Sequence, residues 1–131
     1  MNTVVVGYTP KPPGEAALRL GVEESRLRRA RLLVVRSHQT ELSPHQGRPH
    51  DDGQLHRLLS ELIPYEDVSY EVREERGIDP AEDVLGLATH HEATLIVIGL
   101  RRRSAVGKFL LGSTAQRILL EAPCPVLAVK P

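Results

Sequence analysis

Apolar residues gather in five short runs along the chain, and helix-like patterns separate most of these runs. The first, second and fourth runs are almost entirely apolar, which is typical of strands buried on both faces of a parallel sheet. The third run alternates apolar and polar residues, as expected of an edge strand with one face in water. The predicted strands are residues 3–8, 32–37, 68–73, 95–99 and 126–129.

Helical signals lie between these strands. Small residues recur every four positions at Ala17, Gly21 and Ser25, which predicts a helix with a narrow face against the sheet. Residues 79–82 read Asp-Pro-Ala-Glu, the pattern of a helix start with a capping side chain, a proline in the first turn and an acid three residues after the cap. The alternation predicts a single α/β domain over residues 1–131, with a parallel sheet and helices on both faces.

The fifth run is apolar although, as the last strand, it is expected at an edge of the sheet. Exposed apolar edge strands favour pairing with another chain, so we expect a homodimer. In the alternative interpretation, Pro125 and Pro131 merely protect this edge. The residues expected in the dimer contact are Val126, Leu127, Ala128 and Val129.

Composition narrows the possible functions. The 17 basic residues balance 17 acidic ones, so no basic excess supports general nucleic-acid binding. No apolar run reaches the length of a membrane span and no signal-peptide pattern opens the sequence, which predicts a cytoplasmic protein. Cys124 is the single cysteine, and its apolar surroundings favour a buried structural thiol over a nucleophile.

A polar segment, residues 38–54, is predicted to be a surface loop because it holds two prolines and two glycines. His45, His50 and His56 lie in it or just after it. Their spacing matches no familiar set of metal ligands, and no cysteine or carboxylate set completes one. We therefore favour a solvated loop over a metal site.

The link between the fourth strand and the last helix holds the clearest candidate site. It spans twelve residues, 100–111, whereas such connections usually take about two to six. Residues 113–116 read Ser-Thr-Ala-Gln, which fits a capping box and predicts a helix with Ser113 as its N-cap. The first amides of that helix, its dipole and nearby basic side chains form a pattern typical of anion binding. The basic residues are Arg101, Arg102, Arg103 and Lys108.

Small and hydroxylated residues flank the link. Gly99 and Gly112 would let a phosphate or ribose approach the backbone, and Ser113 and Thr114 would donate hydrogen bonds to phosphate oxygens. Each of these residues alone is better explained as a turn glycine or a helix cap, whereas their combination with the basic residues favours a ligand site. For Arg102, phosphate contact and a solvated or subunit-contact side chain both stay open.

Ligands of such sheets bind where the strand order reverses, so the opposite wall of the crevice is expected at Thr9 and Pro10, after the first strand. The link is not a Walker A loop, because Arg102 replaces its first glycine and Phe109 stands where Ser or Thr must bind magnesium. No nucleophile elbow or acid–base pair is evident. We therefore expect a binding protein and not an enzyme.

These residues resemble the universal stress protein family over essentially the whole chain. The likeness rests on Val-Val-Val-Gly at 4–7 and, more specifically, on residues 95–129, which include Gly99, Gly112, Ser113 and the Ala-Pro-Cys-Pro-Val run. The resemblance implies a five-stranded parallel sheet of order 3-2-1-4-5 and dimerisation through the last strand. One branch of the family binds nucleotides, so the resemblance also implies binding of ATP or another adenine nucleotide, with Mg²⁺ as an accompanying ion.

The match to the nucleotide-binding branch is partial. Gly99, Gly112 and Ser113 keep that branch's spacing, whereas Arg102 stands at its second glycine and Thr9 at the aspartate that follows the first strand. Two functions therefore stay open: a cytoplasmic stress-response sensor or regulator that binds an adenine nucleotide, and an interaction module of the same fold that acts through protein partners. Slow ATP hydrolysis is a third, less favoured alternative.

Overall fold

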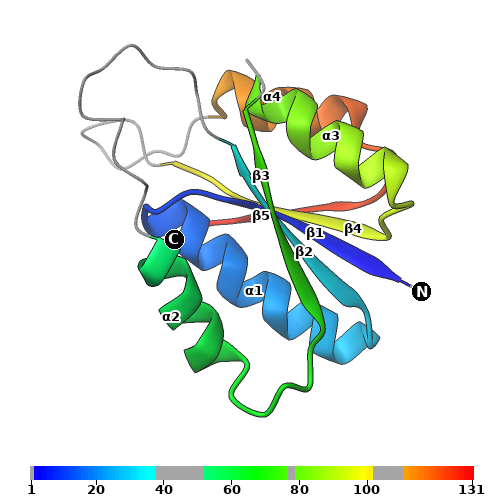
Figure 1. Ribbon diagram of the computed structural model, residues 1–131. Helices are drawn as coiled ribbons and strands as arrows, with labels where there is room; N and C mark the ends of the chain where they lie inside the picture. Colours follow the sequence, from blue (N-terminus) through cyan, green and yellow to red (C-terminus); the bar gives the residue numbers. More distant parts are fainter. Residues whose placement is uncertain (1, 38–51, 77–78, 102–110) are drawn as a thin grey trace.

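The computed structural model describes residues 2–37, 52–76, 79–101 and 111–131. They form one five-stranded parallel sheet of order β3-β2-β1-β4-β5 (Figure 1). The strands are β1 (Thr3–Tyr8), β2 (Arg31–Ser37), β3 (Tyr70–Glu75), β4 (Leu95–Gly99) and β5 (Val126–Val129). The helices are α1 (Pro12–Arg28), α2 (Asp52–Leu62), α3 (Pro80–His90) and α4 (Ser113–Glu121). The predicted fold class and strand order are confirmed.

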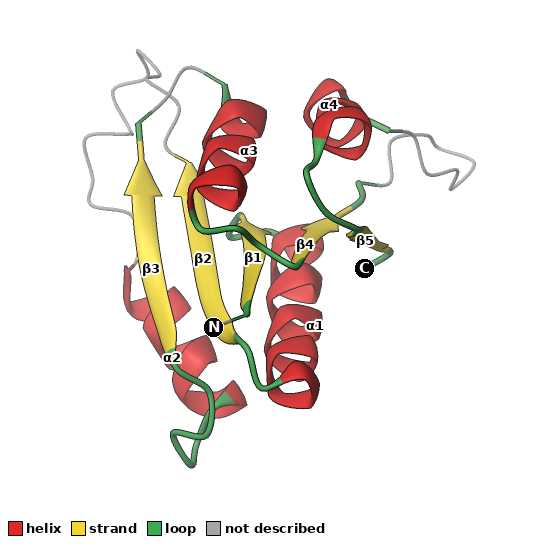
Figure 2. Cartoon of the chain, turned by 90° about the vertical axis from the view of Figure 1, so that its right-hand side faces the viewer, coloured by secondary structure: helices red, strands yellow, loops and turns green. Residues whose placement is uncertain are grey.

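The hydrophobic core forms two layers, one on each face of the sheet. Val4 and Val6 of β1 pack in the layer of α1 and α2, while Val5 packs in the layer of α3 and α4, because successive strand side chains point to opposite faces. Figure 2 shows the two helix pairs on opposite sides of the sheet. The central strands are almost fully buried, and each fully buried aliphatic side chain contributes about 1.5–3 kcal/mol.

The third and fifth strands lie at the two edges of the sheet, as predicted. β3 begins at Tyr70, two residues later than expected, because its pairing with β2 starts where Tyr70 lies opposite Leu32. Val68 is apolar for a different reason: it is buried in the core ahead of the strand. β5, at the other edge, is half-exposed over most of its length.

Two of the helix predictions are confirmed in detail. Ala17, Gly21 and Ser25 are buried on the inner face of α1, and a Cβ on Gly21 would overlap the Val6 side chain. Asp79 caps α3, where its carboxylate accepts a hydrogen bond of 3.0 Å from the Ala81 amide. Within the described parts of the chain, the helices are too short or too polar to cross a bilayer.

Candidate functional site

The strand order places the expected ligand crevice at the carboxyl ends of β1 and β4. These strands are parallel neighbours, with Val6 opposite Val97, yet the chain leaves β1 toward β2 and leaves β4 toward β5. Such a reversal of strand order opens a space that ligands occupy in doubly wound sheets. Two helices, α1 and α4, begin after these two strands.

The start of α1 is packed tightly against both strand ends. A Cβ on Gly14 would overlap the backbone of Thr9, and a Cβ on Gly99 would overlap the carbonyl group of Pro13. Glycine at position 99 is therefore explained by the close approach of the first turn of α1 to the end of β4. Its predicted role in ligand approach stays a prediction, since the face that a side chain would occupy is filled by Pro13.

The start of α1 is poor in backbone N–H donors. Lys11 is the N-cap without a side-chain cap bond, and Pro12 and Pro13, which follow it, have no backbone N–H. The first helical bond runs from the Glu15 amide to the Lys11 carbonyl at 2.9 Å. An anion at the crevice would therefore find few backbone N–H donors at the start of α1.

The first turn of α4 is the opposite case. Gly112 is the N-cap, so the prediction of Ser113 as N-cap is wrong: Ser113 is the first helical residue, because the first helical bond runs from the Gln116 amide to the Gly112 carbonyl at 2.9 Å. In the part of the chain that the structure describes, no side chain caps this helix. The amides of residues 113–115 lack partners within the helix, and the side chains of Ser113 and Thr114 are exposed.

A cationic side chain lies beside this helix start. A Cβ on Gly112 would stand 3.7 Å from Arg101 Nη2, which is ordinary van der Waals contact. A guanidinium at the positive end of a helix is unfavourable for the helix itself, and it strengthens the local attraction for an anion. The start of α4 therefore combines amides without partners inside the helix, two exposed hydroxyl groups and one arginine.

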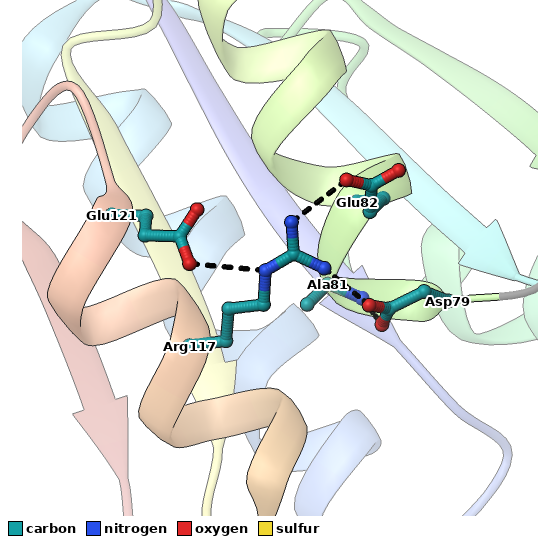
Figure 3. Close-up of polar contacts among 5 residues, drawn as sticks. All are labelled: Asp79, Ala81, Glu82, Arg117 and Glu121. Carbon is teal, nitrogen blue, oxygen red and sulfur yellow. Dashed lines mark hydrogen bonds and ion pairs between the residues drawn. The ribbon is translucent and has the colours of Figure 1, made fainter.

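On another part of α4, Arg117 contacts three carboxylates (Figure 3). Its Nη2 donates to Glu82 Oε1 at 2.7 Å, its Nε donates to Glu121 Oε2 at 3.1 Å, and its Nη1 donates to Asp79 Oδ2. The hydrogen bonds to Glu82 and Glu121 are the largest causes that raise the Arg117 pKa above its usual value. Arg117 thus joins α4 to the first turn of α3.

Cys124 and three histidines are the other candidates for reactive chemistry that the sequence offers. Cys124 is half-buried, and desolvation raises the pKa of its thiol, which disfavours the nucleophilic thiolate. Among the described residues, no three His, Cys, Asp or Glu side chains are grouped as metal ligands would be. His56 is exposed on α2, while His45 and His50 lie outside the described residues.

Comparison with known proteins identifies the family. The model of the universal stress protein family matches residues 1–130. This chain belongs to that family. A universal stress protein of Mycolicibacterium smegmatis is 42% identical over 128 residues, which cover 98% of this chain and 97% of the relative.

Solved structures of universal stress proteins support the assignment. One from Archaeoglobus fulgidus is 30% identical, has a TM-score of 0.73, and covers 99% of this chain and 98% of its own. A structure of the universal stress protein from Archaeoglobus fulgidus in complex with dAMP is 29% identical, with a TM-score of 0.65 and coverage of 99% and 98%.

In this universal stress protein, the predicted site residues lie at two places along the crevice. Thr9 and Pro10 are exposed after β1, and Gly99 ends β4 against the start of α1. The others, Gly112, Ser113 and Thr114, form the start of α4. Arg102 lies outside the described residues.

The Arg117 cluster is the feature that sequence reasoning missed. The spacing of Arg117 and Glu121 signals an ion pair within one helix, and Asp79 and Glu82 lie at the start of another. Only the contact between α3 and α4 shows that all four side chains meet.

Proposed function

We propose that this universal stress protein binds an adenine nucleotide at the crevice and acts as a sensor or regulator. The observation that supports this most directly is the start of α4, where amides without partners inside the helix, the Ser113 and Thr114 hydroxyl groups and the Arg101 guanidinium are grouped. A phosphoryl group is the anion that such a helix start typically binds. The related Archaeoglobus fulgidus protein, whose solved structure is described as a complex with dAMP, supports adenosine phosphates as the ligand class.

The arrangement suggests a polarity for the bound ligand. Phosphoryl oxygens would accept hydrogen bonds from the first turn of α4, and the nucleoside would lie toward Thr9 and Pro10 at the end of β1. The prolines of α1 leave few backbone N–H donors there, whereas the first turn of α4 offers amides and hydroxyl groups together, so the charged end of the ligand is assigned to α4. If Mg²⁺ accompanies ATP, it would be held chiefly by the phosphates, because the described residues offer no cluster of carboxylate ligands.

Calorimetric titration with ATP, ADP, AMP and adenosine tests this function directly. We expect ATP to bind more tightly than adenosine, both with and without magnesium, because only the phosphorylated ligand contacts α4. Mass spectrometry of the denatured protein would detect nucleotide retained through purification. Absence of binding at millimolar nucleotide would remove the proposal.

The proposed role is binding and not turnover. The described residues hold no group of three His, Cys, Asp or Glu side chains that could bind a catalytic metal ion, which supports a sensor over a metal-dependent hydrolase. Release of inorganic phosphate from ATP should stay at the buffer background. A rate above background that Ser113→Ala abolishes would instead support slow hydrolysis.

We also propose that two chains pair through β5. This edge strand is half-exposed, and Leu119 and Leu120 of the preceding helix are 39% and 78% exposed. An apolar edge of this kind is stabilised by pairing with a second copy. Light scattering should give twice the chain mass of 14.5 kDa. Ala128→Arg, a change at an exposed edge position, should yield monomer, whereas Leu27→Arg on the exposed face of α1 should not.

One observation favours a second function. Thr9 stands where the nucleotide-binding branch that this chain resembles has an aspartate, so an interaction module without nucleotide is the alternative. A crystal structure with nucleotide against Ser113 would exclude it.

A further inference from the structure

The helix that begins the proposed phosphate site is weakly anchored. α4 has nine residues, and Ile118 is its one fully buried side chain. Ala115 is only partly buried against the same core layer. Among the described elements, α3 is the neighbour with which α4 makes its main backbone contacts. The orientation of α4 therefore depends strongly on how it is joined to α3.

Arg117 makes the polar connection between these two helices. It lies four residues after Ser113, one turn along α4 on the same side of the helix. Nη1 donates to Asp79, the N-cap of α3, and Nη2 to Glu82 in its first turn, while Nε donates to Glu121 of α4 itself. The contact with Glu121 within α4 holds the plane of the guanidinium so that its Nη1 and Nη2 atoms face α3.

Asp79 gives the connection a defined geometry. One of its carboxylate oxygens accepts the Ala81 amide at 3.0 Å and thereby caps α3, while the other accepts from Arg117. The carboxylate that caps α3 thus also helps to position α4 through its hydrogen bond with Arg117. Figure 3 shows the guanidinium between the two helices, with the three carboxylates around it.

The cluster is suited to orientation more than to stability. The side chains of Arg117 and its partners are between 33% and 64% exposed, and ion pairs with this exposure contribute little to unfolding free energy. Without the guanidinium, however, three carboxylates would face one another across the contact between α3 and α4. Their repulsion would push the second half of α4, which carries Glu121, away from the start of α3 and so change the direction of α4.

We propose that Arg117 is a positioning residue for the phosphate site, an inference that rests on the proposed function. Arg117 sets the direction in which the amides and hydroxyl groups at the start of α4 face the crevice. Its influence is selective, because the phosphoryl groups of the ligand depend on α4 whereas the nucleoside lies toward the end of β1. Arg117 therefore affects preference for the phosphorylated ligand, without touching that ligand.

The test compares ATP and adenosine binding by calorimetry in the wild type, Arg117→Gln, Arg117→Lys and a control, Arg28→Gln. The control removes an exposed ion pair of 3.0 Å with Glu24 on α1, which joins no two helices. Arg117→Gln should reduce the preference for ATP over adenosine about fivefold. Arg117→Lys should restore part of it, because lysine keeps the charge without the planar three-way contact. Arg28→Gln should leave the preference unchanged.

Melting temperatures separate orientation from folding. We expect Arg117→Gln to melt within a few degrees of the wild type. If that variant fails to fold, Glu82→Gln, which removes one of the three partners, should still lower the preference for ATP. An unchanged preference in a folded Arg117→Gln protein overturns the inference and leaves the nucleotide site standing. A wild type without any preference for ATP overturns the phosphate site, and the role of Arg117 with it.

Discussion

Replacing Gly99 with alanine is expected to destabilise the protein by about 3 kcal/mol, because the new methyl group would overlap the backbone of Pro13. Backbone atoms at the start of α1 cannot rotate away as a side-chain tip would. The change should lower the melting temperature by roughly 10 °C in a domain of this size. Thermal unfolding followed by circular dichroism measures this directly.

Gly86→Ala is the matched control for this effect. Gly86 lies within α3, and a Cβ placed there meets nothing within 4 Å. The same substitution should therefore stabilise the protein by about 0.5–1 kcal/mol, since alanine is the better helix former. If both variants melt like the wild type, the close contact between the end of β4 and α1 is absent in solution.

Changing Ser113 to aspartate is expected to separate ligand binding from stability. A carboxylate in the first turn of α4 should stabilise the helix by about 0.3–1 kcal/mol, because it complements the helix dipole. The same carboxylate would face the phosphoryl groups of ATP, and the repulsion should weaken ATP binding about 100-fold. Calorimetry with ATP and a melting curve without ligand measure the two effects.

Two further variants complete the Ser113 experiment. Ser113→Ala removes one hydroxyl donor and leaves the charge unchanged, so affinity should fall about fivefold. Ser69→Asp adds the same charge at an exposed serine ahead of β3, at the other end of the sheet, and should not alter ATP binding. Tight ATP binding by Ser113→Asp would show that the phosphates lie away from α4.

The layers of the sheet and its edge and central strands were predictable from the local sequence pattern, whereas the full strand order followed from the family resemblance. Runs such as residues 95–99 are apolar throughout, and the alternation after Val68 distinguishes an edge strand from a central one. The first residue of β3 was misjudged because burial of Val68 and pairing with β2 produce the same apolar signal. The cap of α4 was displaced by one residue because Gly112 and Ser113 are both favourable N-caps.

The candidate site was predictable only in part, because much of it depends on contacts between distant segments. Ser113 and Thr114 were found from the pattern at a helix start. Pro13, which explains why position 99 is glycine, is far from it in sequence and meets it only through the sheet order. The meeting of Arg117 with Asp79 likewise requires that α3 and α4 cover the same face.

The scarcity of buried contacts on α4 has a consequence for the dynamics of the fold. A helix with Ile118 as its one fully buried side chain needs far less free energy to detach than the central strands do. Amide protons of α4 should therefore exchange with solvent by local opening, whereas those of β1 and β4 should exchange only through global unfolding. If a nucleotide binds as proposed, its phosphate would protect the amides of this one helix and leave exchange in the central strands unchanged.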